Sequence, residues 1–258
     1  MAFNARQAIV TGGATGIGKA VVKQLVDSGA TVFIGDIETA KAEETAAEIE
    51  PTGQRCRAYP LDLGDMDSID AFITSLKPAS EKMDILVNCA GIAAPEEFFE
   101  LTPQQWDRIM DINLKGTFFL SQKISKGMSE ARYGRIVNLS SASAFTPSTR
   151  PMVSYDVSKA ALVMLTKVMA LKLAPYGVTV NSVAPGPVVT DLLRQFFDDP
   201  NTLEKGVEGI PIGRLAQPDD VVEAILFFCS ERSGYITGTT LPVEGGNLLV
   251  KHIVYGVE

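Results

Sequence analysis

Short apolar runs alternate with longer amphipathic segments along almost all of the 258-residue chain. Several of the apolar runs are nearly unbroken, which is typical of parallel strands that are buried on both faces. The predicted strands are residues 7–11, 31–36, 56–62, 84–90, 134–140, 178–185 and 239–246. Strict alternation with helices implies right-handed crossovers, so the pattern predicts an α/β fold with a doubly wound parallel sheet of about seven strands and helices on both faces.

Helical spacing of apolar residues marks the segments between these strands. The predicted helices are residues 16–30, 38–50, 66–77, 102–132, 153–175 and 218–231. The start of the longest is well defined, because Thr102, Pro103 and Gln105 supply an N-cap, a first-turn proline and a capping-box partner. No linker or repeat interrupts the pattern, so residues 1–258 are expected to form a single domain. Residues 185–217 form the one long irregular region, which has the length of a lid or substrate loop.

Composition and charge narrow the possible functions. Hydrophobic residues make up 46% of the chain and the net charge is −8, which favours a protein that does not bind nucleic acid. Cys56, Cys89 and Cys229 are widely scattered, and no signal-length or membrane-length apolar run is present, so a cytoplasmic protein without a membrane anchor is expected. The only histidine, His252, lies near the C-terminus, which argues against a histidine-based metal site or a serine hydrolase triad.

A glycine-rich segment, TGGATGIG at residues 11–18, joins the first predicted strand to the first predicted helix. Free N–H groups and the helix dipole at such a junction can bind a pyrophosphate. Gly12 and Gly16 would permit the turn and the close approach of phosphate, and Gly18 would let the helix pack tightly on the sheet. The spacing differs from the common G-x-G-x-x-G dinucleotide pattern, and a glycine-rich turn without a ligand is the alternative explanation.

An acidic residue follows the glycines at the spacing expected for a dinucleotide site. Asp36 ends the second predicted strand, where a carboxylate can accept hydrogen bonds from the adenosine ribose and repel a 2′-phosphate. Ile37 follows, and no basic residue stands beside Asp36. The pair favours NAD over NADP, although a solvated turn carboxylate would explain Asp36 as well.

Tyr155 and Lys159 lie four residues apart in the predicted helix 153–175, so both side chains fall on one helical face. A tyrosine with an ordinary pKa of about 10 is a poor base at neutral pH, but a nearby ammonium and a positively charged nicotinamide would stabilise its phenolate. Tyr155 would then serve as the base for an alcohol or the acid for a carbonyl. Ser140 and Ser141 end the preceding strand, where an α/β sheet places its ligand. The tyrosine–lysine spacing by itself would also arise by chance.

Taken together, these segments resemble the short-chain dehydrogenase/reductase family, in its single-domain branch with a Rossmann-like fold. The resemblance covers essentially the whole chain and rests on motifs in the family's order: TGGATGIG, Asp36, LDL with Asp62, NCAG at residues 88–91, Asn113, the serine of NLSS, YDVSK and PGPVVT. It implies Tyr155 as the acid/base, Ser141 as the residue that positions the substrate oxygen, and Lys159 as the residue that binds the nicotinamide ribose and lowers the tyrosine pKa. Asn113 is implied in a water-linked proton relay through that lysine.

The same resemblance implies the cofactor contacts. Asp62 is expected at the adenine, Asn88 and Gly91 along the cleft, and Thr190, together with the backbone of Val188, at the carboxamide. Further expected cofactor contacts are Thr15, Ile17, Ile37, Leu63, Ala90, Pro185 and Gly186. The family also implies a homotetramer, with the two largest helices in one interface and the C-terminal strand region in another, although burial of an apolar helix inside a monomer would explain the same pattern.

Two departures from the family pattern affect the site. Cys89 occupies the second position of the usual NNAG motif, where a buried thiol is expected to pack without reacting. The interval from Ser141 to Tyr155 is one residue longer than usual, which indicates an insertion in the loop. Ser143 is therefore an alternative to Ser141 as the substrate-binding serine.

The predicted reaction is a metal-free hydride transfer between nicotinamide and a secondary alcohol or ketone, with a sugar, polyol or related small hydroxy compound as the first substrate class. Specificity is expected to lie in residues 93–97, 145–153 and 188–213. Phe145, Phe196 and Phe197 could wall off an apolar pocket, and Arg150 and Arg194 could bind an anion unless they are merely solvated. The alternatives are a 3-oxoacyl-thioester reductase and a non-catalytic dinucleotide sensor or scaffold.

Overall fold

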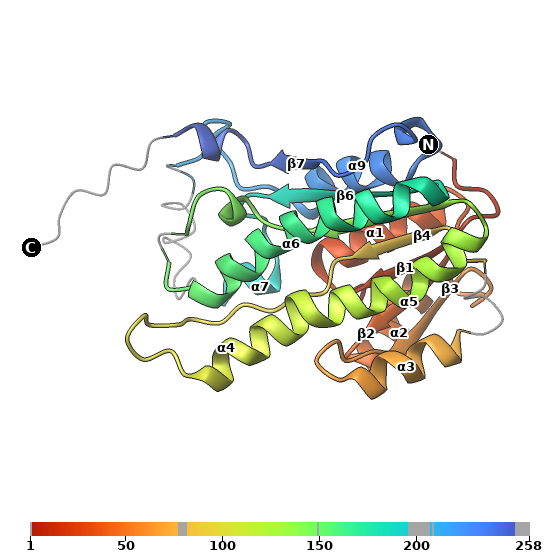
Figure 1. Cartoon of the computed structure of the whole chain (residues 1–258), viewed down its shortest axis with the longest axis horizontal. Coiled ribbons are helices and arrows are strands. Elements are labelled where there is room, and N and C mark those ends of the chain that lie inside the picture. The colour runs from red at the N-terminus through yellow and green to blue at the C-terminus, as the bar shows by residue number, and fades with distance from the viewer. Residues whose placement is uncertain (1, 77–81, 149, 196–206, 208, 251–258) are drawn as a thin grey trace, which may run out of the picture.

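One parallel sheet of seven strands organises the chain, with helices against both of its faces (Figure 1). The computed structural model describes residues 2–76, 82–148, 150–195, 207 and 209–250. The strands are β1 (Gln7–Thr11), β2 (Thr31–Asp36), β3 (Cys56–Pro60), β4 (Ile85–Asn88), β5 (Gly134–Leu139), β6 (Val178–Pro185) and β7 (Thr240–Val243). Their spatial order is β3, β2, β1, β4, β5, β6, β7, and every described pair is parallel. The doubly wound sheet predicted from the sequence is confirmed.

The helices cover the two faces in separate groups. They are α1 (Gly16–Asp27), α2 (Thr39–Ile49), α3 (Met66–Ser75), α4 (Pro103–Met110), α5 (Thr117–Glu130), α6 (Val153–Leu173), α7 (Asp191–Arg194) and α9 (Pro218–Cys229). In Figure 1, α5 and α6 lie in front of the sheet and α4 extends beyond it at the lower left, while α1 and α9 lie behind the sheet.

Alternate residues of the central strands belong to two different hydrophobic cores, because successive side chains of a strand point to opposite faces of the sheet. In β1, Val10 packs with α1, α2 and α9, whereas Ile9 packs with α3, α5 and α6. In β2, Ile34 and Phe33 divide in the same way. Burial on both faces explains why these strands read as unbroken apolar runs in the sequence.

The long helix predicted over residues 102–132 is not one regular α-helix. Thr102 caps α4 through the expected capping box with Gln105, but a π-helical turn, η2 (Asp111–Gly116), separates α4 from α5. A π-turn inserts an extra residue into the helix and is a common feature of functional sites. Asn113 lies within this turn.

A buried chain of side-chain hydrogen bonds links the centre of the sheet to α5 and α6. The Asn88 Nδ2 group donates to the Ser121 hydroxyl at 2.9 Å and to Asn138 Oδ1 at 2.8 Å. Asn138 Nδ2 donates in turn to the Thr166 hydroxyl at 2.9 Å. Asn138 and Thr166 have no exposed surface, so each bond replaces one that water would otherwise make.

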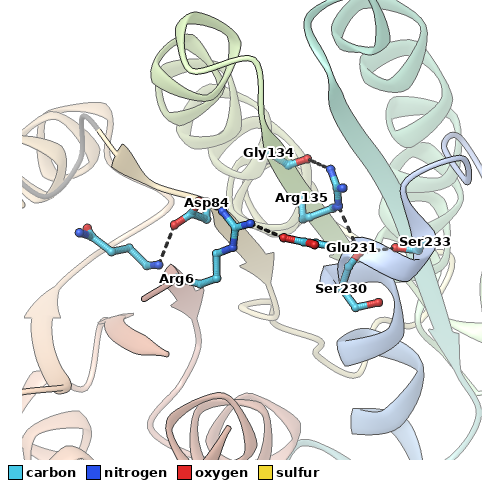
Figure 2. A network of polar contacts seen from close by, with 8 residues as sticks. Arg6, Asp84, Gly134, Arg135, Ser230, Glu231 and Ser233 are labelled. Carbon is cyan, nitrogen blue, oxygen red and sulfur yellow. Dashed lines mark hydrogen bonds and ion pairs between the residues drawn. The ribbon is translucent and has the colours of Figure 1, made fainter. Parts of the chain in front are cut away.

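A second polar network lies at the amino-terminal ends of β1, β4 and β5 (Figure 2). Arg6 forms ion pairs with Asp84 at 2.7 Å and with Glu231 at 2.5 Å. Arg135 is buried and donates to the carbonyl groups of Gly134 and Ser230. The guanidinium carbon atoms of Arg6 and Arg135 lie 4.1 and 4.6 Å from the Tyr133 ring centroid. These contacts tie the N-terminal segment to β4, β5 and the segment after α9.

Replacing Asn138 by Ala is expected to lower the free energy of unfolding by about 2–4 kcal/mol, because the change leaves Asn88 and Thr166 with unmatched buried polar groups. The fall can be measured by chemical denaturation, compared with Gln104→Ala on the exposed side of α4. If both variants lost the same small amount of stability, the buried network would contribute little.

Candidate active site

The glycine-rich turn brings the start of α1 close to the backbone of two strands. Gly12 has a φ of +67°, and a Cβ atom there would lie 2.8 Å from the Ala90 Cα atom. A Cβ atom on Gly18 would lie 2.0 Å from the Gly12 carbonyl oxygen. The N-cap residue of α1, Thr15, makes no side-chain hydrogen bond to the helix, so the first-turn N–H groups remain available to an anionic ligand.

Asp36 lies at the end of β2 with its carboxylate fixed by the backbone. Its Oδ2 atom accepts a hydrogen bond from Ala14 N, and its Oδ1 atom accepts one from Glu38 N, both at 3.0 Å. Only 9% of the residue is exposed. The carboxylate is therefore held at the glycine-rich turn and keeps lone pairs for further donors.

A cleft of about 330 Å³ opens where β1 and β4 end, at the point where the strand order reverses. Open α/β sheets place their ligands at this point. The cleft is lined by twelve of the predicted cofactor residues: Gly12, Thr15, Gly16, Ile17, Gly18, Asp36, Ile37, Asp62, Leu63, Ala90, Gly91 and Thr190.

Six other predicted cofactor residues do not line the cleft, and two of these, Tyr155 and Lys159, lie on α6. Asn88 instead holds the buried network between β4, β5, α5 and α6. Val188 is buried and forms a bridge with Ala216, and Pro185 ends β6. The Gly186 amide donates to the Val243 carbonyl group, beside β7.

Several residues that line the cleft could not be assigned from the sequence. Arg108 and Ile112 both reach it from α4 and the π-turn, and Ile92 and Leu139 also line it. Arg108 and Ile112 are four residues apart, so a helix through this segment places them on a common face. No sequence motif distinguishes such a face from an ordinary solvent-facing one.

Lys159 lies fully inside the protein on α6, only 4% exposed. Its ammonium group donates to the Leu139 carbonyl oxygen at 2.9 Å and lies 5.5 Å from the centroid of the Tyr155 ring. Burial lowers the pKa of Lys159 to about 8. A Cβ atom on Gly91 would come within 3.1 Å of the Lys159 Nζ atom, so the cleft ends directly at this lysine.

Tyr155 has its pKa raised to about 12, chiefly because the phenol is buried. The Ser141 hydroxyl hydrogen-bonds the phenol and lowers the pKa, whereas the charge of Asp156 raises it. The protein groups alone therefore do not produce the lowered pKa expected from the sequence, because the lysine is itself desolvated and donates to Leu139. The cationic nicotinamide, which formed part of that expectation, is the remaining source of positive charge.

The two candidate serines occupy different positions in the longer loop. Ser141 contacts the Tyr155 phenol and also accepts a hydrogen bond from Ser143 N at 3.2 Å. Ser143 lies near the Asp156 carboxylate and lowers its pKa, which burial as the larger effect raises, but the Ser143 hydroxyl makes no hydrogen bond within the described residues. The structure brings Ser141, and not Ser143, to the tyrosine.

Asn113 connects the π-turn to the cleft and to α6. Its Oδ1 atom accepts from Ile92 N at 2.8 Å, and its Nδ2 atom donates to the Ile92 carbonyl oxygen at 2.9 Å. The same Nδ2 atom donates to the Ser158 hydroxyl at 3.1 Å. Asn113 is fully buried, and its Oδ1 atom lies 3.2 Å from the position of a Cβ atom on Gly91.

Cys89 lines the same cleft but has the properties of a packed thiol. Burial raises its pKa to about 12, and the charge of Lys159 only partly offsets that effect. A thiol with so high a pKa carries almost no thiolate at neutral pH. The structure therefore favours packing over reactivity for this departure from the family pattern.

The expected specificity segments are described only in part. Phe196 and Phe197 lie outside the described residues, as does His252, whereas Phe145 is 48% exposed. Arg194 is exposed and pairs with Asp191 at 3.4 Å, as a solvated arginine would. Arg150 is half-buried, and burial lowers its pKa. The Thr190 hydroxyl accepts from Leu193 N and caps α7 beside Gly16.

Two features of the described residues bear on other classes of function. Within the described part of the chain, no group of three or more metal-ligating side chains lies close enough to hold a metal ion. Within the same residues, no helix has the length and apolar character to cross a membrane.

The cleft suits a dinucleotide on the chemistry of its lining. The free N–H groups of α1 can receive a pyrophosphate, and the fixed Asp36 carboxylate can accept ribose hydroxyl groups. The apolar side chains of Ile37 and Leu63 can contact an adenine ring. The far end of the cleft reaches Lys159 and Asn113 at Gly91.

Comparisons with known proteins agree with this geometry. The family profile described as "Enoyl-(Acyl carrier protein) reductase" matches residues 12–247. The chain is 36% identical to the 2,3-dihydro-2,3-dihydroxybenzoate dehydrogenase of Bacillus subtilis, over 94% of this chain and 95% of that protein. It is 35% identical to the NAD-dependent glycerol dehydrogenase of Listeria innocua, over 93% and 92% of the two chains.

A solved structure shows the same fold. The 3-ketoacyl-(acyl-carrier-protein) reductase from Brucella melitensis, in complex with NADH, superposes with a TM-score of 0.87 at 32% identity, over 95% of this chain and 99% of that one. Together with the parallel sheet and the tyrosine–lysine pair at the end of the cleft, these matches show that the chain belongs to the short-chain dehydrogenase/reductase family of oxidoreductases.

Proposed function

We propose that the protein is an NAD-dependent oxidoreductase that interconverts a secondary alcohol and its ketone. The observation that carries this proposal is that Lys159 meets the cleft at Gly91 and Leu139 and lies 5.5 Å from the centroid of the Tyr155 ring. The cofactor residues would be those that line the cleft, from the glycine-rich turn to Thr190. When bound, NAD supplies the hydride acceptor in oxidation and, as NADH, the hydride donor in reduction.

The side chains of the protein would handle the proton. Tyr155 accepts the hydroxyl proton during alcohol oxidation and returns it to the carbonyl oxygen during reduction. Ser141 contacts the phenol and would hold the substrate oxygen against it. The charge of Lys159 would favour the phenolate together with the cationic nicotinamide, and the lysine would exchange a proton with water positioned by Asn113, because both side chains approach Gly91.

Asp36 supports the choice of NAD over NADP. Its carboxylate is nearly buried and fixed by two backbone amides, so it cannot swing away from an added 2′-phosphate. Arg108 is the one cationic side chain among the described residues that line the cleft. It reaches the cleft from α4 rather than from the loop after β2, which leaves the charge of Asp36 locally unopposed.

The proposed substrate is a sugar, polyol or similar small hydroxy compound. The names of the diol and glycerol dehydrogenases among the relatives support this class. A 3-oxoacyl thioester is the second candidate, because the structural neighbour in complex with NADH is a 3-ketoacyl reductase. That complex also means that a preference for NADH would not by itself exclude the thioester class.

The same helices that build the site would join copies of this chain into a homotetramer. The outer face of α6 exposes Val157, Met164, Val168 and Leu171, with exposed fractions between 43% and 74%. Helical spacing places these apolar side chains on a face that lies away from the sheet. A face of this kind is typical of an interface between subunits.

Replacing Tyr155 by Phe tests the proposed reaction. Turnover is expected to fall by about 100- to 10,000-fold because the proton donor and acceptor is lost. Absorbance at 340 nm reports turnover with polyols, sugars, hydroxy acids and an acetoacetyl thioester, and NADH fluorescence reports cofactor binding, which should persist. Full activity in this variant would contradict the assignment, and binding without turnover in the unaltered protein would favour a sensor.

The pH profile tests the role of Ser141. Because the Ser141 hydroxyl lowers the pKa of Tyr155, its removal in Ser141→Ala should raise that pKa. For alcohol oxidation, kcat/KM should increase with pH, and this increase should occur about 1–2 pH units higher in the variant. A shift of this size corresponds to the loss of one hydrogen bond to a charged group. Ser143→Ala is the matched control and should leave the profile in place. A shift in the control alone would assign the role to Ser143.

Replacing Asp36 by Ala tests cofactor selection. The KM for NAD should rise, and the ratio of kcat/KM for NAD to that for NADP should fall by about tenfold, the equivalent of roughly 1.4 kcal/mol. Arg108→Ala should leave the ratio unchanged. If the ratio changed in the Arg108 variant and not in the Asp36 variant, Arg108 would be the residue that reads the 2′ position.

A further inference from the structure

Two buried serines lie immediately before the two catalytic side chains of α6. Ser154 directly precedes Tyr155, and Ser158 directly precedes Lys159. The two serines are therefore four residues apart, as are the tyrosine and the lysine. Both serines have no exposed surface. Because residues four apart share one helical face, the two serines form a second face of α6, next to the catalytic one.

The segment that follows β4 holds Ser154 directly and is linked to Ser158 through Asn113. The Ser158 hydroxyl receives a hydrogen bond from Asn113, which in turn holds the backbone of Ile92. Ser154 is held by Glu96, whose Oε2 atom accepts from Ser154 N at 2.8 Å and whose Oε1 atom accepts from the Ser154 hydroxyl. Residues 91–96 are thus attached to α6 at two points, one turn apart.

Glu96 is a buried carboxylate with a well-defined location. The residue is only 2% exposed, its backbone N–H donates to the Pro151 carbonyl oxygen at 2.7 Å, and it forms a bridge with Met152. A buried carboxylate is costly unless its oxygen atoms are hydrogen-bonded. Glu96 therefore has little freedom to leave Ser154.

The residue at the N-cap position of α6 does not cap the helix with its side chain. Met152 is the N-cap residue, and its side chain makes no hydrogen bond to the helix. The Glu96 carboxylate supplies that cap from another part of the sequence, and a negative charge is favourable at a helix N-terminus. The bond to Ser154 N lies one residue from Tyr155, so it fixes the rotation of the helical turn that carries the phenol.

We propose that Glu96 is a positioning residue for Tyr155, acting through Ser154. This inference rests on the proposed function, because it assigns Tyr155 to proton transfer. Glu96 holds the first turn of α6 so that the phenol faces Ser141 and the end of the cleft. Asn113 and Ser158 hold the next turn, which carries Lys159.

Substitutions of Glu96 and Ser154 in the full-length protein test the proposal. Glu96→Ala is expected to lower kcat by about 10- to 100-fold, the size of effect produced by a misplaced catalytic group. The dissociation constant for NADH should stay within about threefold because neither residue lines the cleft, and so should the KM for the substrate because both residues are buried. A larger primary isotope effect with deuterated substrate should accompany the loss, because hydride transfer becomes slower relative to product release.

Conservative variants separate positioning from folding. Glu96→Gln keeps an acceptor for Ser154 N and can donate to the Ser154 hydroxyl, so it should recover most of the lost kcat. Ser154→Ala removes the hydroxyl contact and, combined with Glu96→Ala, should cost less than the sum of the two single changes, as expected for residues that act as a unit. Ser233→Ala, a buried serine at the opposite edge, is the control and should lower stability without changing kcat.

The outcomes distinguish this inference from the proposed function. If Tyr155→Phe abolishes turnover but Glu96→Ala retains normal kcat and isotope effect, the positioning role is wrong and the reaction stands. If Glu96→Ala and Ser233→Ala lose kcat in equal proportion to their loss of stability, the role is structural only and the inference is overturned. If Tyr155→Phe remains fully active, both the reaction and this inference fall.

Discussion

The burial of the Lys159 ammonium against the end of β5 is the interaction on which the site depends. Taking a charged amine out of water is unfavourable, and the Leu139 carbonyl oxygen offsets only part of that cost. The arrangement persists because α6 packs against the core on one face of the sheet through Met169 and Ala170. The packing of one face of α6 therefore keeps the Lys159 ammonium buried on another face, although its burial is electrostatically unfavourable. This combination is characteristic of functional sites.

The two-sided burial of the sheet made most of the fold predictable. Strands that are apolar throughout can be recognised without knowledge of their neighbours, and all seven were placed within a few residues of their observed ends. The glycine-rich turn and Asp36 were also predictable, because each carries out a local task at a strand end. By contrast, the π-turn at residues 111–116 has ordinary helical composition, so nothing local distinguishes it from a regular turn.

What the sequence could not supply were interactions made between distant segments. Asn88 belongs to a cofactor motif, but its side chain turns into the network with Ser121 and Asn138 rather than into the cleft. The rise in the Tyr155 pKa likewise follows from how deeply α6 is covered, which spacing cannot reveal. Glu96 lies in a segment expected to set specificity, and only the folded chain shows that it meets Ser154.

The π-turn has a consequence for how this chain tolerates insertions and deletions. An α-helix advances by about 100° per residue, so removing one residue from 111–116 would restore a regular helix and rotate everything on one side of the deletion by that angle. Either Asn113 would turn away from Ile92, or the apolar face of α5, with Leu120, Ile124 and Met128, would turn away from the sheet. The length of this segment is therefore constrained more tightly than its composition, and lineages that lose a residue there must rebuild either the core or the site.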